Sequence, residues 1–227
     1  MGASIVADIA LKLTESIDVI ERKIRRALAR EADREVKRVA GLLTTEVKPI
    51  IAKALRNSPT IQELSTSGSL RGELGLTSGV GPGMANEIVD SIVSTVQVEA
   101  KKVTIMGNKF AGGLNIYIQP AGLRNLLELS GGSYKYYSRT YKQYVEINWL
   151  DWLIRKGDAI LVGKFEFEEA GSKGFQGRSG MGTMVRGGMW RVPPLHAGTI
   201  DDNFITRAIS HTDTVNSILK LIEKNFK

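Results

Sequence analysis

The stretch Ser179–Ile209, SGMGTMVRGGMWRVPPLHAGTIDDNFITRAI, sets the expected organisation of the C-terminal part of this chain. Its glycine-rich beginning gives way to a strand-like run, Met189–Val192. Pro193 and Pro194 then fix a rigid corner, because each proline ring locks its own backbone φ angle. A flexible glycine-rich segment, a short strand and a fixed corner are the parts of a docking element.

A helix is expected to follow this corner. Thr199 predicts its N-cap, and Asp201 and Asp202 fall in the first turn, where the helix dipole favours negative charge. We expect Trp190 and Phe204 to be buried at a subunit or core contact, and Arg207 to pair with an acid there. The residues predicted to make assembly contacts are Arg178, Met184, Trp190, Arg191, Pro193, Pro194, Asp202, Phe204 and Arg207.

The composition indicates a folded protein of one or two domains. The 227 residues are 42% hydrophobic and carry a formal net charge of +7, and cysteine is absent. The lack of cysteine excludes disulfides, thiolate nucleophiles and zinc–thiolate sites. No run approaches the ~20 apolar residues of a membrane span, so we expect cytoplasmic synthesis and no membrane contact.

The N-terminal segment has helical periodicity from about Ile5 to Arg56. Apolar residues recur three and four positions apart from Ile9 to Leu28 and again from Val36 to Ala54. An unbroken helix of this length would span about 75 Å, which favours two helices or a bent one. It is too long to be buried wholly against its own domain, so we expect part of it to meet another subunit. The expected domains are 1–57, a long helical segment, and 58–227.

Basic residues outnumber acidic ones by eight to four between Glu21 and Arg38. A basic helix face can follow the phosphates of a nucleic acid. The candidate DNA-facing residues are Arg22, Arg25, Arg26 and Arg30. The simpler alternative is a solvated face supported by pairs within the helix, such as Glu31 with Arg34.

The second domain is predicted to be α+β, an antiparallel sheet with flanking helices and a C-terminal helix over 213–226. Val98–Met106 and Leu114–Ile118 alternate like the two strands of a hairpin. Ser78–Gly83 predicts a turn or hinge, and 171–188 a glycine-rich loop. Tyrosines and basic residues mix between Gly131 and Tyr144, a composition that suits either base stacking or, as we favour, a protein interface.

No catalytic, cofactor-binding or metal-binding set is evident in the sequence. Gly157–Phe165 resembles a phosphate-binding loop, but its spacing is one residue too long and no hydroxyl residue follows Lys164. His196 and His211 are the two histidines, and neither has the neighbours of a metal-ligand set. We therefore expect a protein that is not an enzyme and that has no cofactor.

Several motifs of the chain resemble one class of virion protein. They are LRGELGL (70–76), WLDWLIRKG (149–157), RSGMGTM (178–184), WRVPP (190–194) and AGTIDDNFITRA (197–208). Over roughly Ser58–Phe226 the chain is similar to the neck, head–tail joining and tail-completion proteins of tailed bacteriophages with contractile tails. The long N-terminal helix lies outside this resemblance.

The resemblance implies a fold of helices and an antiparallel sheet, and a homo-oligomeric ring between the head and the tail. The partners would be other copies of the chain, neighbouring proteins such as the portal or adaptor and the tail terminator or sheath, and transiently the genomic DNA. The protein would then be part of the virion and be assembled in the host cytoplasm. The alternatives are a non-specific nucleic-acid-binding protein that uses its basic helix, and a tail hydrolase, for which a buried carboxylate pair in a cleft would be the sign.

Overall fold

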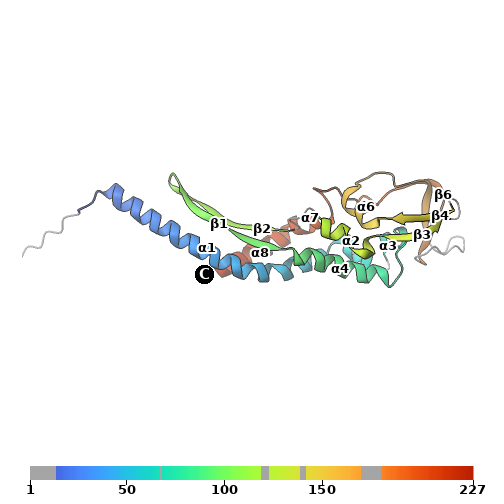
Figure 1. The fold of residues 1–227 in the computed structure, drawn as a ribbon, viewed down its shortest axis with the longest axis horizontal. Coiled ribbons are helices and arrows are strands. Elements are labelled where there is room, and N and C mark those ends of the chain that lie inside the picture. The colour runs from blue at the N-terminus through green and yellow to red at the C-terminus, as the bar shows by residue number, and fades with distance from the viewer. Residues whose placement is uncertain (1–13, 67, 119–122, 139–141, 170–179, 227) are drawn as a thin grey trace, which may run out of the picture.

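The computed structural model describes residues 14–66, 68–118, 123–138, 142–169 and 180–226. The fold is mixed α+β, as predicted, with a long N-terminal helix, small antiparallel sheets and a C-terminal helix. Figure 1 shows an elongated molecule. One end holds most of the short helices and strands, and the N-terminal part of the first helix projects from the other end.

Helix α1 is a single helix from Ile17 to Arg56. Its 40 residues span about 60 Å. Of the two expected forms, two helices or one bent helix, the described part is not two helices. The predicted start near Ile5 lies outside the described residues. Pro49 is inside the helix and does not end it. Val39, Leu43 and Val47 of α1 are fully buried, as their four-residue spacing predicts.

The other elements are short and follow one another closely. The helices are α2 Pro59–Ser65, α3 Ser69–Glu73, α4 Val80–Ser94, α5 Arg124–Leu127, the 3-10 helix Ser130–Gly132, α6 Trp149–Arg155, α7 Phe204–Ser210 and α8 Thr212–Asn225. The strands form three antiparallel pairs: β1 Gln97–Met106 with β2 Lys109–Tyr117, β3 Tyr134–Ser138 with β4 Gln143–Ile147, and β5 Val162–Glu169 with β6 Gly182–Trp190.

Two glycine-rich segments differ from their predictions. The expected turn at Ser78–Gly83 is largely helical, because α4 begins at Val80. The loop expected over 171–188 is strand β6 from Gly182 onward, and 171–179 lie outside the described residues. In β6, Gly182 lies against Phe167 of β5, where an added Cβ would be 2.4 Å from the ring. A glycine is therefore required for the two strands to approach.

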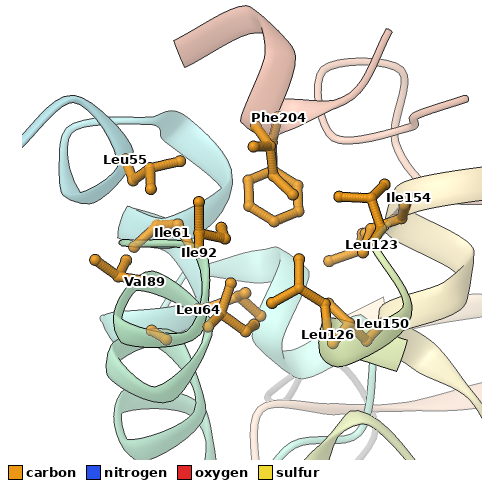
Figure 2. Close-up of a cluster of buried hydrophobic side chains, with 14 of the residues drawn as sticks. Leu55, Ile61, Leu64, Val89, Ile92, Leu123, Leu126, Leu150, Ile154 and Phe204 are labelled. Atoms are coloured by element: carbon orange, nitrogen blue, oxygen red, sulfur yellow. The ribbon is translucent and has the colours of Figure 1, made fainter. Parts of the chain in front are cut away.

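One hydrophobic core joins α1 to the compact end of the molecule (Figure 2). Leu55 of α1 lies near Val89 and Ile92 of α4, and Phe204 of α7 points into the same cluster. From the other side, α6 contributes Leu150 and Ile154. The core therefore fixes the position of the last turns of α1 and leaves its N-terminal half outside.

Candidate assembly surfaces

The Trp190 corner is part of the core of the subunit. The Trp190 side chain is 5% exposed, and the centroid of its ring lies 5.7 Å from the centroid of the Trp152 ring. Its indole Nε1 donates a hydrogen bond of 2.8 Å to Oε2 of Glu73. Burial raises the pKa of the Glu73 carboxyl above its usual range, although this hydrogen bond opposes the shift. Of the two contacts predicted for Trp190, subunit or core, the structure has the core contact.

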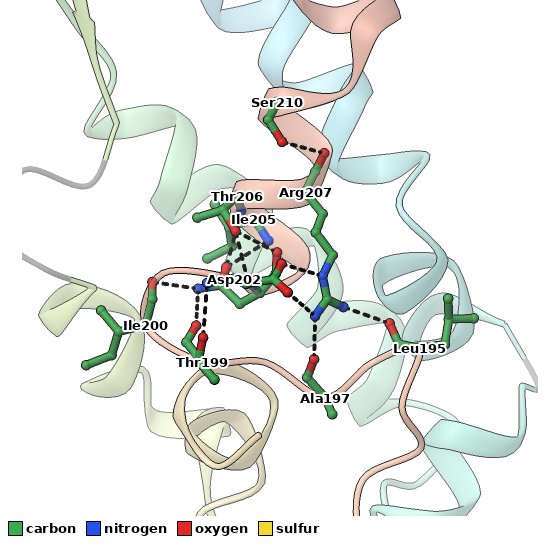
Figure 3. Close-up of polar contacts among 10 residues, drawn as sticks. Leu195, Ala197, Thr199, Ile200, Asp202, Ile205, Thr206, Arg207 and Ser210 are labelled. Atoms are coloured by element: carbon green, nitrogen blue, oxygen red, sulfur yellow. Dashed lines mark hydrogen bonds and ion pairs between the residues drawn. The ribbon is translucent and has the colours of Figure 1, made fainter. Parts of the chain in front are cut away.

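The helix after the corner begins four residues later than predicted. Thr199 and Asp202 close a turn, in which the Thr199 hydroxyl accepts from Asp202 N at 3.1 Å. The N-cap of α7 is Asn203, whose side-chain oxygen accepts from Ile205 N and Thr206 N. Its amide also donates to the carbonyls of Thr199 and Ile200 (Figure 3). The side chain of Asn203 therefore bonds backbone N–H groups at the start of α7 and backbone carbonyls in the turn before it. Asn203 is fully buried.

Arg207 pairs with an acid, as predicted, and that acid is Asp202 of the same chain. Arg207 Nε and Nη2 lie 2.7 Å and 3.1 Å from the two Asp202 oxygens, and the guanidinium also donates to the carbonyls of Leu195 and Ala197. Hydrogen bonding to Arg207 lowers the pKa of Asp202. With Phe204 buried beside them, these contacts hold the Pro193–Asp202 loop onto α7.

The remaining predicted assembly residues divide by exposure. Met184 is half-buried against the core, and Pro193 is also half-buried. Arg191 and Pro194 are exposed and stay available to a partner. Arg178 lies outside the described residues. Trp190, Phe204 and Arg207 are therefore used within the subunit.

A second candidate surface is the part of the molecule that projects from the core. We define the arm as residues Ile17–Arg38 of α1 together with the β1–β2 hairpin that runs beside them (Figure 1). Val103 N of β1 donates to Asp33 Oδ1 at 3.0 Å, and Arg25 Nη1 donates to Asn108 Oδ1 at the hairpin turn at 2.7 Å. These contacts fix the hairpin along one side of the helix.

One side of the arm helix carries an apolar row that the described residues leave open. This arm stripe consists of Ile17, Ile24 and Leu28, which are 74%, 53% and 53% exposed. Residues seven and four positions apart lie on one side of a helix. Such a row normally faces a core or a partner.

The opposite side of the arm helix is basic. Arg22, Arg26 and Arg30 follow one another at four-residue intervals, and Arg26 is two residues, or about 200°, from both Ile24 and Leu28. Among the described residues, Arg26 and Arg30 have no hydrogen bond or ion pair. Arg25 differs from the other candidates, because it pairs with Glu21 and holds the hairpin turn.

Further along α1 the basic residues pair within the helix. Arg34 contacts Glu31 at 2.9 Å, Lys37 contacts Asp33 at 2.8 Å, and Arg38 pairs with Glu35. The prediction of intra-helix pairs is confirmed for this part. In the arm helix, the arginines that form no ion pair with another described residue are therefore Arg22, Arg26 and Arg30. Arg22 does donate to the carbonyl of Asp18 at 3.2 Å.

The C-terminal helix α8 carries a second open apolar row. This α8 stripe consists of Val215 and Leu219 together with Phe226, the C-cap of the helix. They are 41%, 50% and 42% exposed, respectively. Ile218 and Ile222 of the same helix are half-buried against the core. The subunit therefore covers only part of the apolar face predicted for 213–226, and the α8 stripe is the part left exposed.

The tyrosine-rich segment forms the β3–β4 hairpin. Tyr136, Tyr137 and Tyr144 are exposed, and the rings of Tyr137 and Tyr144 meet edge to face at 5.4 Å. Tyr134 instead turns inward, and its hydroxyl donates to the carbonyl of Leu74 at 2.9 Å. The hairpin thus presents aromatic side chains at the end of the molecule opposite to the arm (Figure 1).

The two histidines have different surroundings. His196 is buried, its Nδ1 lies 3.0 Å from the Thr60 hydroxyl, and burial lowers its pKa below the usual range. His211 is exposed, and its Nδ1 lies 3.7 Å from Oδ2 of Asp213. The described residues contain no group of three or more His, Cys, Asp or Glu side chains placed to hold a metal ion. None of the helices within the described ranges is long and apolar enough to cross a bilayer.

Comparison with known proteins gives no relative for this chain. No protein-family model, no curated protein and no solved structure matches it.

Proposed function

We propose that this protein is a structural subunit that assembles with copies of itself into a ring. The arm stripe is the observation that carries the proposal. Three large aliphatic side chains in a row, at least half exposed, are unfavourable in water, and each gains roughly 25 cal/mol for every Å² that a partner covers. An arm that leaves the core is placed to reach a neighbouring subunit.

The sequence resemblance supplies the biological setting of the proposal. It is to neck, head–tail joining and tail-completion proteins of phages with contractile tails. We therefore place the ring in the virion, between head and tail or at the top of the tail. There its neighbours would be other head–tail proteins. The exposed Arg191 and Pro194 and the tyrosine hairpin are the surfaces that remain for them.

The proposal is tested by the mass of the purified protein in solution, measured by light scattering at several concentrations and two salt levels. A discrete oligomer is expected, which Ile24→Asp should dissociate. Ala27→Asp is the matched control, because it adds the same charge one turn away at an exposed position outside the arm stripe. A wild-type chain that stays monomeric at every concentration would refute the proposal.

A second candidate function is non-specific binding to nucleic acid. The observation that favours it is the row of Arg22, Arg26 and Arg30 on the side of the arm opposite to the arm stripe. Their four-residue spacing sets them about 6 Å apart along the helix, and a row of cations binds a phosphate backbone without reading its sequence. Both functions can coexist in one subunit, because they use opposite sides of the same helix.

A further inference from the structure

We propose that the arm stripe of one subunit packs antiparallel against the α8 stripe of the next copy. This inference rests on the proposed self-assembly and names the two surfaces that meet. It assigns a single occupant, a second copy of this chain, to each open apolar row.

The two stripes have the same spacing when they are read in opposite directions. From Ile17 the arm stripe continues after seven and then four residues, to Ile24 and Leu28. From Phe226 the α8 stripe, read backwards, also continues after seven and then four residues, to Leu219 and Val215. An antiparallel contact therefore aligns three pairs at once: Ile17 with Phe226, Ile24 with Leu219, and Leu28 with Val215. Each stripe is about 16 Å long.

Antiparallel pairing of two arm stripes over their full length has no such match. If Ile17 of one arm faces Leu28 of another, Ile24 faces Glu21. That arrangement would cover a carboxylate with an aliphatic side chain, which is unfavourable. In this register the arm stripe is therefore better matched to α8 than to an antiparallel copy of itself.

The subunit cannot cover its own arm stripe with its own α8. Helix α8 runs antiparallel to α1, from the neighbourhood of Ala54 at its start to Asn225, which bonds to Arg38 and Glu46. It ends there, beside the middle of α1 (Figure 1). The arm stripe begins more than two turns further along the helix.

The directions of the helices also fit a ring. Because α8 is antiparallel to its own α1, an arm that packs antiparallel on α8 runs parallel to that α1. Each subunit then gives its arm to one neighbour and its α8 to the other. This is a heterologous contact, which generates a ring when the rotation between neighbours closes.

A cross-linking experiment tests this pairing directly, because the chain has no cysteine. Ile24→Cys and Leu219→Cys are made on separate chains, mixed at a concentration where the wild type is oligomeric, and treated with a mild oxidant. The expected product is a disulfide-linked dimer that contains one chain of each kind. Ile24→Cys mixed with Ser217→Cys is the control, since Ser217 is exposed on α8 away from the α8 stripe.

The outcomes separate this inference from the proposed function. If the wild type is oligomeric but the mixed disulfide does not exceed the Ser217 control, or if Ile24→Cys or Leu219→Cys links mainly to itself, the pairing is wrong and self-assembly stands. A monomeric wild type refutes both. As an independent measurement, Leu219→Asp should weaken self-association by about tenfold or more, because it places a charge in an apolar contact. Unchanged association with this variant would also overturn the pairing.

Discussion

Trp190 and Glu73 join the end of β6 to α3 through a hydrogen bond of 2.8 Å from the indole Nε1 to the carboxylate Oε2. Glu73 is held where burial raises its pKa. A raised pKa in the folded state means that the folded protein binds this proton more tightly than the unfolded chain does. The contribution of Glu73 to stability is therefore largest below its unfolded pKa, about 4.3, and declines as the pH rises towards the folded value.

Glu73→Gln should remove this decline, because the amide oxygen still accepts from Trp190 but does not ionise. Relative to the wild type, the variant should gain stability between pH 4 and pH 7 in urea unfolding experiments. Trp190→Phe is the companion variant. This variant leaves Glu73 without its indole donor. Its free energy of unfolding should be lower than that of the wild type by about 1 kcal/mol. A constant difference between Glu73→Gln and the wild type across this pH range would contradict the assignment.

His196 predicts a pH dependence of the opposite sense. Burial lowers its folded-state pKa, so the unfolded chain binds the proton more tightly, and stability should fall as the pH drops below about 6.5. His196→Gln should flatten the unfolding free energy between pH 7.5 and pH 5.5. Thr60→Val, which keeps the histidine and removes its hydroxyl partner, should retain the slope. A wild type equally stable at both pH values would show that His196 is not held neutral.

Asn203→Ala should be among the most destabilising polar substitutions in the molecule. It removes the N-cap of α7, a loss of about 1–2 kcal/mol, and it leaves the carbonyls of Thr199 and Ile200 without their donor. Asp201→Ala is the control in the same turn, at an exposed position. Thermal unfolding of the two variants should differ clearly, and equal melting temperatures would count against this role.

Gly81 and Gly83 offer a matched pair in the first turn of α4. A Cβ at Gly81 would lie 2.4 Å from Arg71 Cδ and 2.6 Å from the Leu64 carbonyl, whereas one at Gly83 would meet nothing within 4 Å. Gly81→Ala should therefore destabilise the fold. Gly83→Ala should be neutral or stabilising by up to about 1 kcal/mol. Chemical denaturation measures both, and a stable Gly81→Ala would mean that α2 and α4 pack less closely than described.

The basic row of the arm makes a prediction about salt. If the arm binds nucleic acid, replacing both Arg26 and Arg30 with Gln should reduce the slope of log affinity against log salt by about two for random-sequence duplex DNA. Replacing Arg34 and Arg38 should have less effect, because these side chains already pair with Glu31 and Glu35. Equal effects of the two double variants, or no salt-dependent binding by the wild type, would argue against this second function.

Local periodicity predicted the elements, and tertiary contacts decided most of the differences. The buried row Val39, Leu43 and Val47 followed directly from its spacing. The start of α4 did not, because Gly-Pro-Gly is typical of a turn. Here Pro82 falls in the first helical turn, where no N–H donor is needed, and Gly81 makes room for Arg71.

In the candidate assembly surfaces too, tertiary contacts decided what the sequence pattern left open. Apolar character predicted that Trp190 and Phe204 would be buried, but it could not choose between a core and a subunit contact. Thr199 and Asn203 are both good N-caps by residue type, and the contacts made by Asn203 decide between them. The exposure of Ile17, Ile24 and Leu28 depends on where the hairpin and α8 pack on α1, which single-sequence periodicity does not contain.

Because α1 is one continuous helix, its length sets the distance between the arm stripe and the part of α1 that α8 covers. The arm stripe and the part of α1 that α8 covers have centres about 24 residues, or roughly 36 Å, apart along one continuous helix. The step from one subunit to the next would then be a property of the number of residues in α1. Seven residues added between Leu28 and Val36 would lengthen that step by about 10 Å while keeping both stripes on nearly the same side. The diameter of the assembly would be encoded in the length of one helix.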